Sequence, residues 1–277
     1  MRRAVFLDRD DTLIANRSLE PAPGLKRGDL CDPSRVRLLD GALEACRLLR
    51  DAGYLLIVIS NQGVVARGGG TIEQVRATNE RMSELLVGED GSPLLDGVYF
   101  CPYHPEGTVE PYNREHPWRK PQPGMILAAC EEHGLDPSRC WVVGDAERDL
   151  EAGRRAGISE DRRILVWDEG GPTLLEAALR IVGSEPRAAR ATATLRTING
   201  SALEDEAVRR ALASAARALG DRTGVRVTAT RFEDGVFEIE VEGGTAVALG
   251  VAAELRRSTN AWARATRDGA LWPGGDA

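Results

Sequence analysis

The chain has 277 residues, of which 42% are hydrophobic, so it is long enough for one large domain or for an ordinary domain with a smaller one. Its formal net charge of −7 argues against a broad surface for nucleic acid or for an anionic membrane. No stretch approaches the roughly 20 apolar residues of a membrane span, and no apolar signal segment follows Met1-Arg2-Arg3. We therefore expect a cytoplasmic protein that binds a small ligand, with neither nucleic acid nor membrane as a partner.

The five cysteines are odd in number and scattered, without a Cys-x-x-Cys pair. This pattern favours free thiols in a reducing compartment over a disulfide framework.

Strand-like and helical segments alternate along the first two thirds of the chain. This alternation predicts an α/β fold, with a doubly wound parallel sheet of Rossmann-like type. We expect strands around Val5 and at 54–59, 97–101, 140–144 and 164–167, and helices at 40–49, 72–86, 125–133, 150–156 and 174–181. Residues 15–37, rich in Pro, Gly and charge, are expected to form a long loop.

Polar side chains follow three of these strands. Asp8 and Asp10 end the first strand, where they share one face if the backbone stays extended. Ser60, Asn61 and Gln62 follow the second strand, and Asp145 follows the strand at 140–144. Ligands of open parallel sheets bind beyond the carboxyl ends of the strands. The two aspartates can therefore hold a divalent cation, although a solvated acidic turn is the alternative.

The pattern breaks near 183–191, so we expect a first domain at 1–183 and a small α+β domain at 192–277. In the second domain we expect a strand at 192–198, helices at 202–219 and 247–265, and a hairpin of strands 225–229 and 236–241. No catalytic cluster is evident there. A small added domain with an apolar helix face favours dimerisation, although capping of the active site and binding of a regulator are alternatives.

Four ordered motifs resemble the haloacid dehalogenase (HAD) superfamily of phosphohydrolases. They are Asp8-x-Asp10-x-Thr12, Ser60, Lys120 in Arg119-Lys120-Pro121, and Gly144-Asp145-x-x-x-Asp149. The resemblance spans about residues 3–183 and implies a HAD-like fold. The segments Phe6-Leu7-Asp8-Arg9-Asp10 and 60–68 resemble more narrowly the branch that holds heptose-bisphosphate and histidinol-phosphate phosphatases.

The resemblance implies a role for each motif. Asp8 is expected to be the nucleophile that forms an aspartyl-phosphate, and Asp10 the general acid and base. Ser60 and Lys120 are expected to hold the phosphoryl group. The implied Mg²⁺ ligands are the Asp8 carboxylate, the Asp10 carbonyl and the Asp145 carboxylate. Asp149 is expected to support Asp145 or Lys120, or to be an ordinary first-turn carboxylate.

Substrate contacts are expected from Asn61, Arg67 and Arg119. Of the 36 basic side chains only Lys26 and Lys120 are lysine, so a lysine kept at position 120 argues that ammonium geometry is needed there.

In these relatives the loop before Arg119 typically holds zinc through Cys-x-His and Cys-x-Cys. Here the corresponding residues are Cys101, Tyr103, His116 and Trp118, of which only the first is retained. Tyr and Trp do not provide the ligands of a tetrahedral zinc site. We therefore expect no zinc, and a loop held by packing of Tyr103, Tyr112 and Trp118. A makeshift site of Cys101, His104 and His116 is the alternative.

The motifs together imply a Mg²⁺-dependent phosphatase that acts on a small phosphorylated metabolite. A heptose-type sugar bisphosphate is the expected substrate, and histidinol phosphate is the alternative. A non-catalytic binding or regulatory protein that keeps the fold is the alternative of another class.

Overall fold

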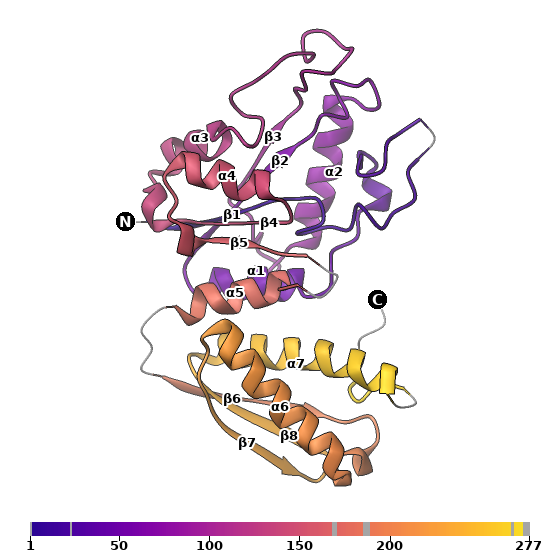
Figure 1. Cartoon of the computed structure of the whole chain (residues 1–277), viewed down its shortest axis with the longest axis vertical. Coiled ribbons are helices and arrows are strands. Elements are labelled where there is room, and N and C mark those ends of the chain that lie inside the picture. The colour runs from indigo at the N-terminus through magenta and orange to yellow at the C-terminus, as the bar shows by residue number, and fades with distance from the viewer. Residues whose placement is uncertain (1, 23, 168–170, 185–188, 267–268, 274–277) are drawn as a thin grey trace. The chain divides into compact units, whose positions relative to one another are not determined.

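The computed structural model describes residues 2–22, 24–167, 171–184, 189–266 and 269–273 (Figure 1). The chain forms two compact units, Met1–Leu174 and Leu175–Ala277. Each unit has its own sheet, so the two are described separately.

The first unit is built on a five-stranded parallel sheet with the order β3-β2-β1-β4-β5. Its strands are β1 (Ala4–Leu7), β2 (Leu55–Asn61), β3 (Gly97–Cys101), β4 (Trp141–Gly144) and β5 (Arg163–Leu165). Every residue of β1 and β4 is buried, which explains why these strands are continuously apolar rather than alternating. The predicted doubly wound α/β fold is confirmed.

Helices connect the strands of this sheet (Figure 1). They are α1 (Ala42–Asp51), α2 (Ile72–Leu85), α3 (Gly124–His133) and α4 (Glu147–Ala156), together with three short 3₁₀ turns. The start of α2 is fixed by a capping box, because Thr71 Oγ1 accepts from Gln74 N and Gln74 Oε1 accepts from Thr71 N. Within the predicted long loop 15–37, the described residues form no α-helix or strand, and Pro33–Arg35 form a 3₁₀ turn.

The second unit combines α5 (Leu174–Gly183) with an antiparallel sheet of order β6-β8-β7 and two further helices. Its elements are β6 (Arg190–Arg196), α6 (Glu206–Thr223), β7 (Val227–Glu233), β8 (Val236–Glu242) and α7 (Thr245–Thr266). Along β8, Phe237, Ile239 and Val241 are buried and alternate with glutamates. The predicted hairpin is confirmed, and its turn places Asp234 and Gly235 at φ 43° and 74°.

Two boundaries differ from those expected. Helix α6 begins at Glu206 rather than near 202, because Asp205 caps it through Ala207 N and a 3₁₀ turn precedes it. Helix α5 lies almost wholly in the second unit, whereas the sequence pattern placed it in the first domain. Its Glu176 pairs with Arg222 of α6 at 2.5 Å, which explains this grouping. Residues 185–188, within the expected boundary, lie outside the described residues.

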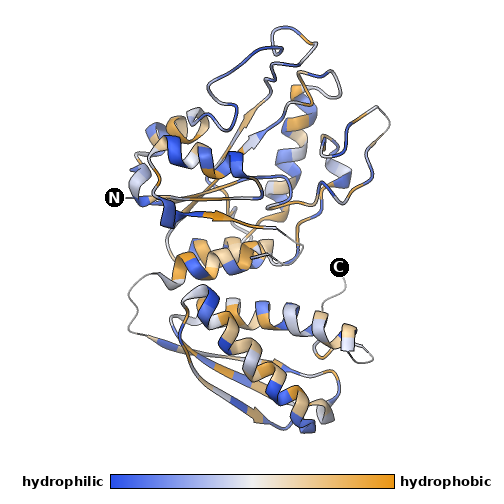
Figure 2. Cartoon of the chain, in the orientation of Figure 1, coloured by the Kyte–Doolittle hydropathy of each residue, from blue (hydrophilic) through white to orange (hydrophobic). Residues whose placement is uncertain are grey.

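The helices also differ in polarity. Figure 2 shows a mostly apolar α5 and a strongly polar α4. Across the described residues, no helix combines the length and the apolar character that crossing a bilayer requires.

Candidate active site

The sheet brings the sequence-predicted carboxylates together at one edge. Strand β1 lies between β2 and β4, and Leu7 is in register with Val58 and Val143. All three strands are parallel, so Asp8, Ser60 and Asp145 emerge from the same end of the sheet. Asp8 and Ser60 are buried, with 2% and 0% exposure.

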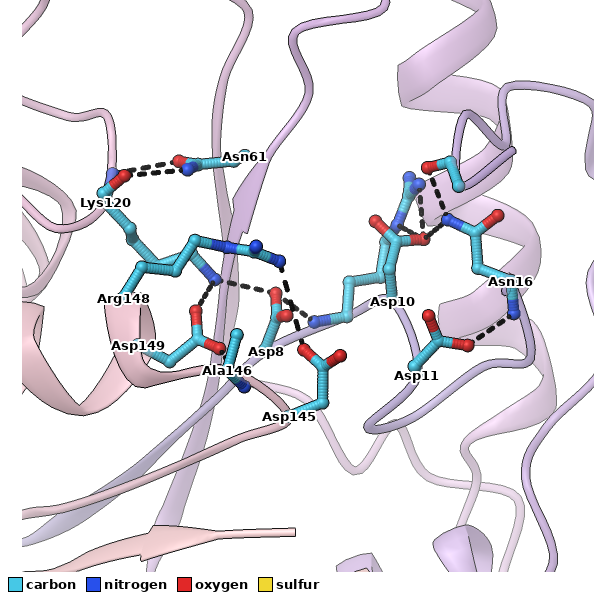
Figure 3. A network of polar contacts seen from close by, with 12 residues as sticks. Asp8, Asp10, Asp11, Asn16, Asn61, Lys120, Asp145, Ala146, Arg148 and Asp149 are labelled. Carbon is cyan, nitrogen blue, oxygen red and sulfur yellow. Dashed lines mark hydrogen bonds and ion pairs between the residues drawn. The ribbon is translucent and has the colours of Figure 1, made fainter. Parts of the chain in front are cut away.

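Lys120 reaches this edge from the loop before α3. Its Nζ lies 2.7 Å from each of three oxygens, Asp8 Oδ1, Asp149 Oδ1 and Ile59 O. Burial lowers the pKa of Lys120, but the charges of Asp8 and Asp149 outweigh it, so the net shift is upward. Lys120 therefore stays charged and fixes the Asp8 carboxylate in place (Figure 3).

The backbone of Lys120 is held by Asn61. Asn61 Nδ2 donates to Lys120 O and Asn61 Oδ1 accepts from Lys120 N, both at 2.9 Å. The expected contact of Asn61 with substrate stays a prediction. Here its amide side chain orients the lysine.

Asp10 lies in a dense set of hydrogen-bond donors. Its Oδ1 accepts from Arg9 Nη2 at 2.9 Å and from Asn16 Nδ2 at 2.8 Å, and its Oδ2 accepts from Gln62 Nε2 at 2.8 Å. Burial raises the pKa of Asp10, and Asp8 adds to that rise, while Arg9 and Gln62 oppose it. A carboxyl group with a raised pKa is suited to donate and accept a proton near neutral pH.

The hydroxyl of Ser60 is joined to Asp10 through Gln62. Gln62 Nε2 lies 2.8 Å from Ser60 Oγ as well as from Asp10 Oδ2. The Gln62 amide therefore fixes the distance between the Asp10 carboxylate and the Ser60 hydroxyl.

The turn after Asp10 needs an unusual backbone conformation. Asp11 has φ 56°, in the left-handed region where Gly, Asn and Asp are tolerated. Its Oδ1 accepts from the backbone N of Asn16 and of Arg17. These bonds offset the strain and fix the start of the long loop.

Asp8, Asp145 and Asp149 form the carboxylate cluster, whose oxygens lie within 4.8 Å of one another. Burial, Asp8 and Asp149 raise the pKa of Asp145 to about 6. Asp145 Oδ1 is buried and, within the described part of the chain, has no hydrogen-bond partner. Clustered oxygen donors with one left unsatisfied fit a hard divalent cation such as Mg²⁺.

Asp149 also restricts which residue can stand at position 144. Its Oδ2 accepts from Ala146 N at 3.0 Å, and a Cβ at Gly144 would lie 2.6 Å from the same oxygen. Only glycine lets β4 end directly against Asp149.

Lys26, Arg67 and Arg119 form a cationic cluster around His104, which packs against Gly63 next to Gln62 of the site. A Cβ at Gly63 would lie 2.8 Å from Arg67 Nη1 and 3.0 Å from His104 Cδ2, so these two side chains flank Gly63. Burial lowers the pKa of His104, and the charges of Arg119, Arg67 and Lys26 lower it further. Arg67 is paired with Asp29 at 2.5 Å.

Arg119 is held by a backbone carbonyl, whereas Arg67 is held by a carboxylate. Arg119 Nη1 donates to Tyr103 O at 3.1 Å. Burial lowers the pKa of Arg119, with further lowering by Arg67 and Arg148. Cys101 and Glu115 oppose this lowering of the Arg119 pKa.

The loop before Arg119 is held by aromatic rings. Tyr103 stacks on His116 at 4.1 Å between ring centroids and meets Tyr112 edge-on at 5.4 Å. Trp118 meets Tyr99 edge-on at 6.0 Å. The predicted packing of Tyr103, Tyr112 and Trp118 is therefore confirmed, while the absence of zinc stays a prediction.

Sequence reasoning did not assign roles to Arg9, Asn16, Arg17 and Gln62. Arg9 is fully buried and bonds Asp10, Asn79 Oδ1 and Leu30 O. An arginine next to a motif gives no sign of burial, because arginine is usually exposed. Gln62 could have been found, since it follows Ser60 at the strand spacing of two.

Comparisons with known proteins fit this geometry. A HAD-hydrolase-like family model matches residues 117–166. A D-glycero-beta-D-manno-heptose-1,7-bisphosphate 7-phosphatase from Pasteurella multocida (strain Pm70) is 37% identical over 158 residues, which cover 57% of this chain and 79% of the relative. The chain belongs to the HAD-like hydrolases. It is a phosphatase of that family.

Two further relatives agree. A D-glycero-alpha-D-manno-heptose-1,7-bisphosphate 7-phosphatase from Burkholderia mallei (strain ATCC 23344) is 36% identical over 180 residues, with 65% of this chain and 88% of the relative covered. A crystal structure of a HAD-like phosphatase from Mesorhizobium loti superposes with a TM-score of 0.50 at 36% identity, covering 57% of this chain and 70% of the other. Membership among HAD phosphatases sets aside the non-catalytic alternative.

Proposed function

We propose that this phosphatase is Mg²⁺-dependent and removes one phosphate from a small sugar bisphosphate of the heptose type. The observation that carries the proposal is the buried pair of Asp8 and Lys120, 2.7 Å apart, beside an Asp10 with a raised pKa. The heptose-bisphosphate phosphatases similar to this chain support the substrate class.

The first half of the reaction forms an ester on Asp8. Asp8 Oδ1 is held by Lys120 Nζ and Arg9 N, which leaves Oδ2 to attack the phosphorus. As the new P–O bond forms, the bond to the sugar oxygen breaks, and Asp10 donates its proton to that oxygen. The Asp8 and Asp145 carboxylates would hold a Mg²⁺ ion, which would supply positive charge for the phosphoryl oxygens.

The second half regenerates the carboxylate. Asp10, now ionised, accepts a proton from a water molecule that attacks the same phosphorus. The bond between phosphorus and Asp8 Oδ2 breaks, which releases inorganic phosphate. Ser60 orients a phosphoryl oxygen, and Lys120 contributes its charge at short range, because its ammonium group already donates to Asp8 Oδ1 and Ile59 O and forms an ion pair with Asp149.

The cationic cluster supports a bisphosphate rather than a monophosphate. A second phosphate carries roughly two negative charges near neutral pH, and Arg119 offers a planar set of donors to it. Arg67 is less available, because Asp29 already pairs with it. We therefore assign the non-reacting phosphate to Arg119, with His104 and Lys26 close by.

The test is phosphate release in the presence of Mg²⁺ from a heptose 1,7-bisphosphate, another sugar bisphosphate and histidinol phosphate. We expect the heptose bisphosphate to have the highest kcat/KM. Asp8→Asn should abolish release, and Asp51→Asn, an equal change at an exposed helix end, should leave it unchanged. Release from histidinol phosphate alone would replace the substrate proposal, and no release from any phosphate ester would overturn it.

A further inference from the structure

Arg17 is the first exposed residue of the long loop. Its backbone and the tip of its side chain contact different groups. Its backbone N donates to Asp11 Oδ1 at 2.8 Å, so the main chain is fixed against the catalytic turn. Its side chain is 65% exposed, yet its tip lies against a carboxylate that is only 2% exposed. A long exposed side chain on an anchored backbone can leave that carboxylate without moving the loop.

The carboxylate is that of Asp145. Arg17 Nη2 donates to Asp145 Oδ2 at 2.5 Å, while Asp11 Oδ2 is more distant at 3.8 Å. Asp145 belongs to the carboxylate cluster that fits a divalent cation. Arg17 therefore occupies one oxygen of a carboxylate that the cation needs.

The other two cations near Asp145 compensate its charge less directly. Lys120 pairs with Asp8 and Asp149, at 2.7 Å from each. Arg148, on α4, approaches Asp145 Oδ1 only to 4.0 Å (Figure 3). Arg17, at 2.5 Å, is thus closer to Asp145 than Arg148 is, at 4.0 Å.

We propose that Arg17 is a built-in competitor of the divalent cation for Asp145. In the metal-free protein it neutralises the carboxylate, and metal binding displaces it into solvent. Displacement is inexpensive because the exposed Arg17 guanidinium is readily hydrated, while the cation replaces it as the counter-charge of the buried Asp145 carboxylate. The inference rests on the proposed Mg²⁺ site and adds a residue that sets the affinity of that site.

The decisive measurement is the affinity for Mg²⁺ alone, by calorimetric titration without substrate. Arg17→Gln replaces the guanidinium with a shorter, neutral side chain and so removes the competing, repelling charge; we expect Mg²⁺ to bind about two- to five-fold tighter. Arg81→Gln is the matched control, because Arg81 is also exposed and pairs with Glu84 at 2.9 Å on α2. Its affinity should equal that of the wild type.

A second measurement tests the metal-free state. In EDTA, Arg17→Gln should melt at a lower temperature than the wild type, because Asp145 has lost its counter-charge. Saturating Mg²⁺ should remove or reverse that difference. Equal or weaker Mg²⁺ binding by Arg17→Gln would overturn the inference. Phosphate release by a wild type that binds Mg²⁺ would meanwhile leave the proposed function standing, whereas no Mg²⁺ binding by either protein would overturn the metal site and this inference together.

Discussion

Lys120 Nζ lies 2.7 Å from Asp8 Oδ1 and at the same distance from Asp149 Oδ1, so one ammonium group joins the nucleophile candidate to the carboxylate at the start of α4. All three side chains are almost completely buried. A buried charge that loses its partner is costly, so stability and activity depend on the same lysine.

Replacing this lysine should therefore affect both properties. Lys120→Met keeps the length of the side chain but leaves Asp8 and Asp149 without their cation. We expect the free energy of unfolding to fall by about 3–5 kcal/mol, and kcat to fall at least ~100-fold. Urea unfolding and steady-state kinetics measure the two effects.

A double variant separates the effect on stability from the effect on kcat. Lys120→Met with Asp149→Asn removes one of the two orphaned charges, so it should regain part of the lost stability without regaining activity. Near-normal kcat in Lys120→Met would contradict the placement of Lys120 at the reacting group.

The dependence of kcat on pH should reflect the ionisation of Asp10. As the general acid, Asp10 must carry a proton when the sugar oxygen leaves, so the rate should fall as the pH rises through its raised pKa. The hydrogen bond from Gln62 favours the ionised form and opposes that rise. Gln62→Leu should therefore raise the pKa of Asp10 further and move the alkaline limb of kcat to higher pH. A limb that stays in place or moves to lower pH speaks against Asp10 as the acid.

Without a metal ion, the ionised Asp145 carboxylate should lower the stability of the fold. Its pKa is raised to about 6, so the folded chain retains a proton at Asp145 between about pH 4 and pH 6 that the unfolded chain has lost. Stability due to this group therefore decreases as the pH rises through that range. In EDTA at pH 7, Asp145→Asn should be more stable than the wild type, by on the order of 1–3 kcal/mol.

The advantage should shrink as the pH falls toward 4, and Mg²⁺ should stabilise the wild type more than the variant. Urea unfolding at several pH values, with EDTA or with Mg²⁺, checks both trends. A variant less stable than the wild type in EDTA at pH 7 is the contrary result.

The parts of this protein that sequence predicts well are those set by local pattern. Continuous apolar runs located β1, β2 and β4, and the position of polar residues after them located Asp8, Ser60 and Asp145. The contacts that complete the site are long-range. Arg17 meets Asp145 across 128 positions, and no periodicity indicates such a pair.

The boundaries of helices and of the two units are less predictable, because they also depend on contacts between distant residues. Helix α5 has the composition of any buried helix, and only its ion pair with α6 shows which unit it joins. The start of α6 depends on a choice between two capping residues, Asn199 for the 3₁₀ turn and Asp205 for the helix, and both have suitable side chains.

The second unit is predicted to dimerise the enzyme. Strand β6 is an edge of its sheet, and Ile198, which follows it, is 62% exposed. Edge strands and exposed apolar side chains favour association with another chain. Light scattering on the full chain should give the mass of two 29.9 kDa subunits, and Ile198→Asp should weaken the dimer. A full-length monomer at micromolar concentration rejects this role.

The aromatic loop offers a test of how a zinc site was replaced. The side chains at 103 and 116 stack at 4.1 Å, the ring at 118 lies 6.3 Å from that at 116, and Cys101 Sγ lies 4.0 Å from Tyr103 O. The four positions at which the resemblance implies a zinc motif are therefore neighbours, and the side chains at 103, 116 and 118 pack as rings.

Three substitutions, Tyr103→His, His116→Cys and Trp118→Cys, together restore the Cys-x-His and Cys-x-Cys pattern. We expect the purified triple variant to hold one zinc per chain, because three thiolates and one imidazole suit a tetrahedral site. The wild type should hold none, since its loop is stabilised by ring packing instead. Metal analysis measures both, and stoichiometric zinc in the wild type would show that Cys101, His104 and His116 form a site of their own.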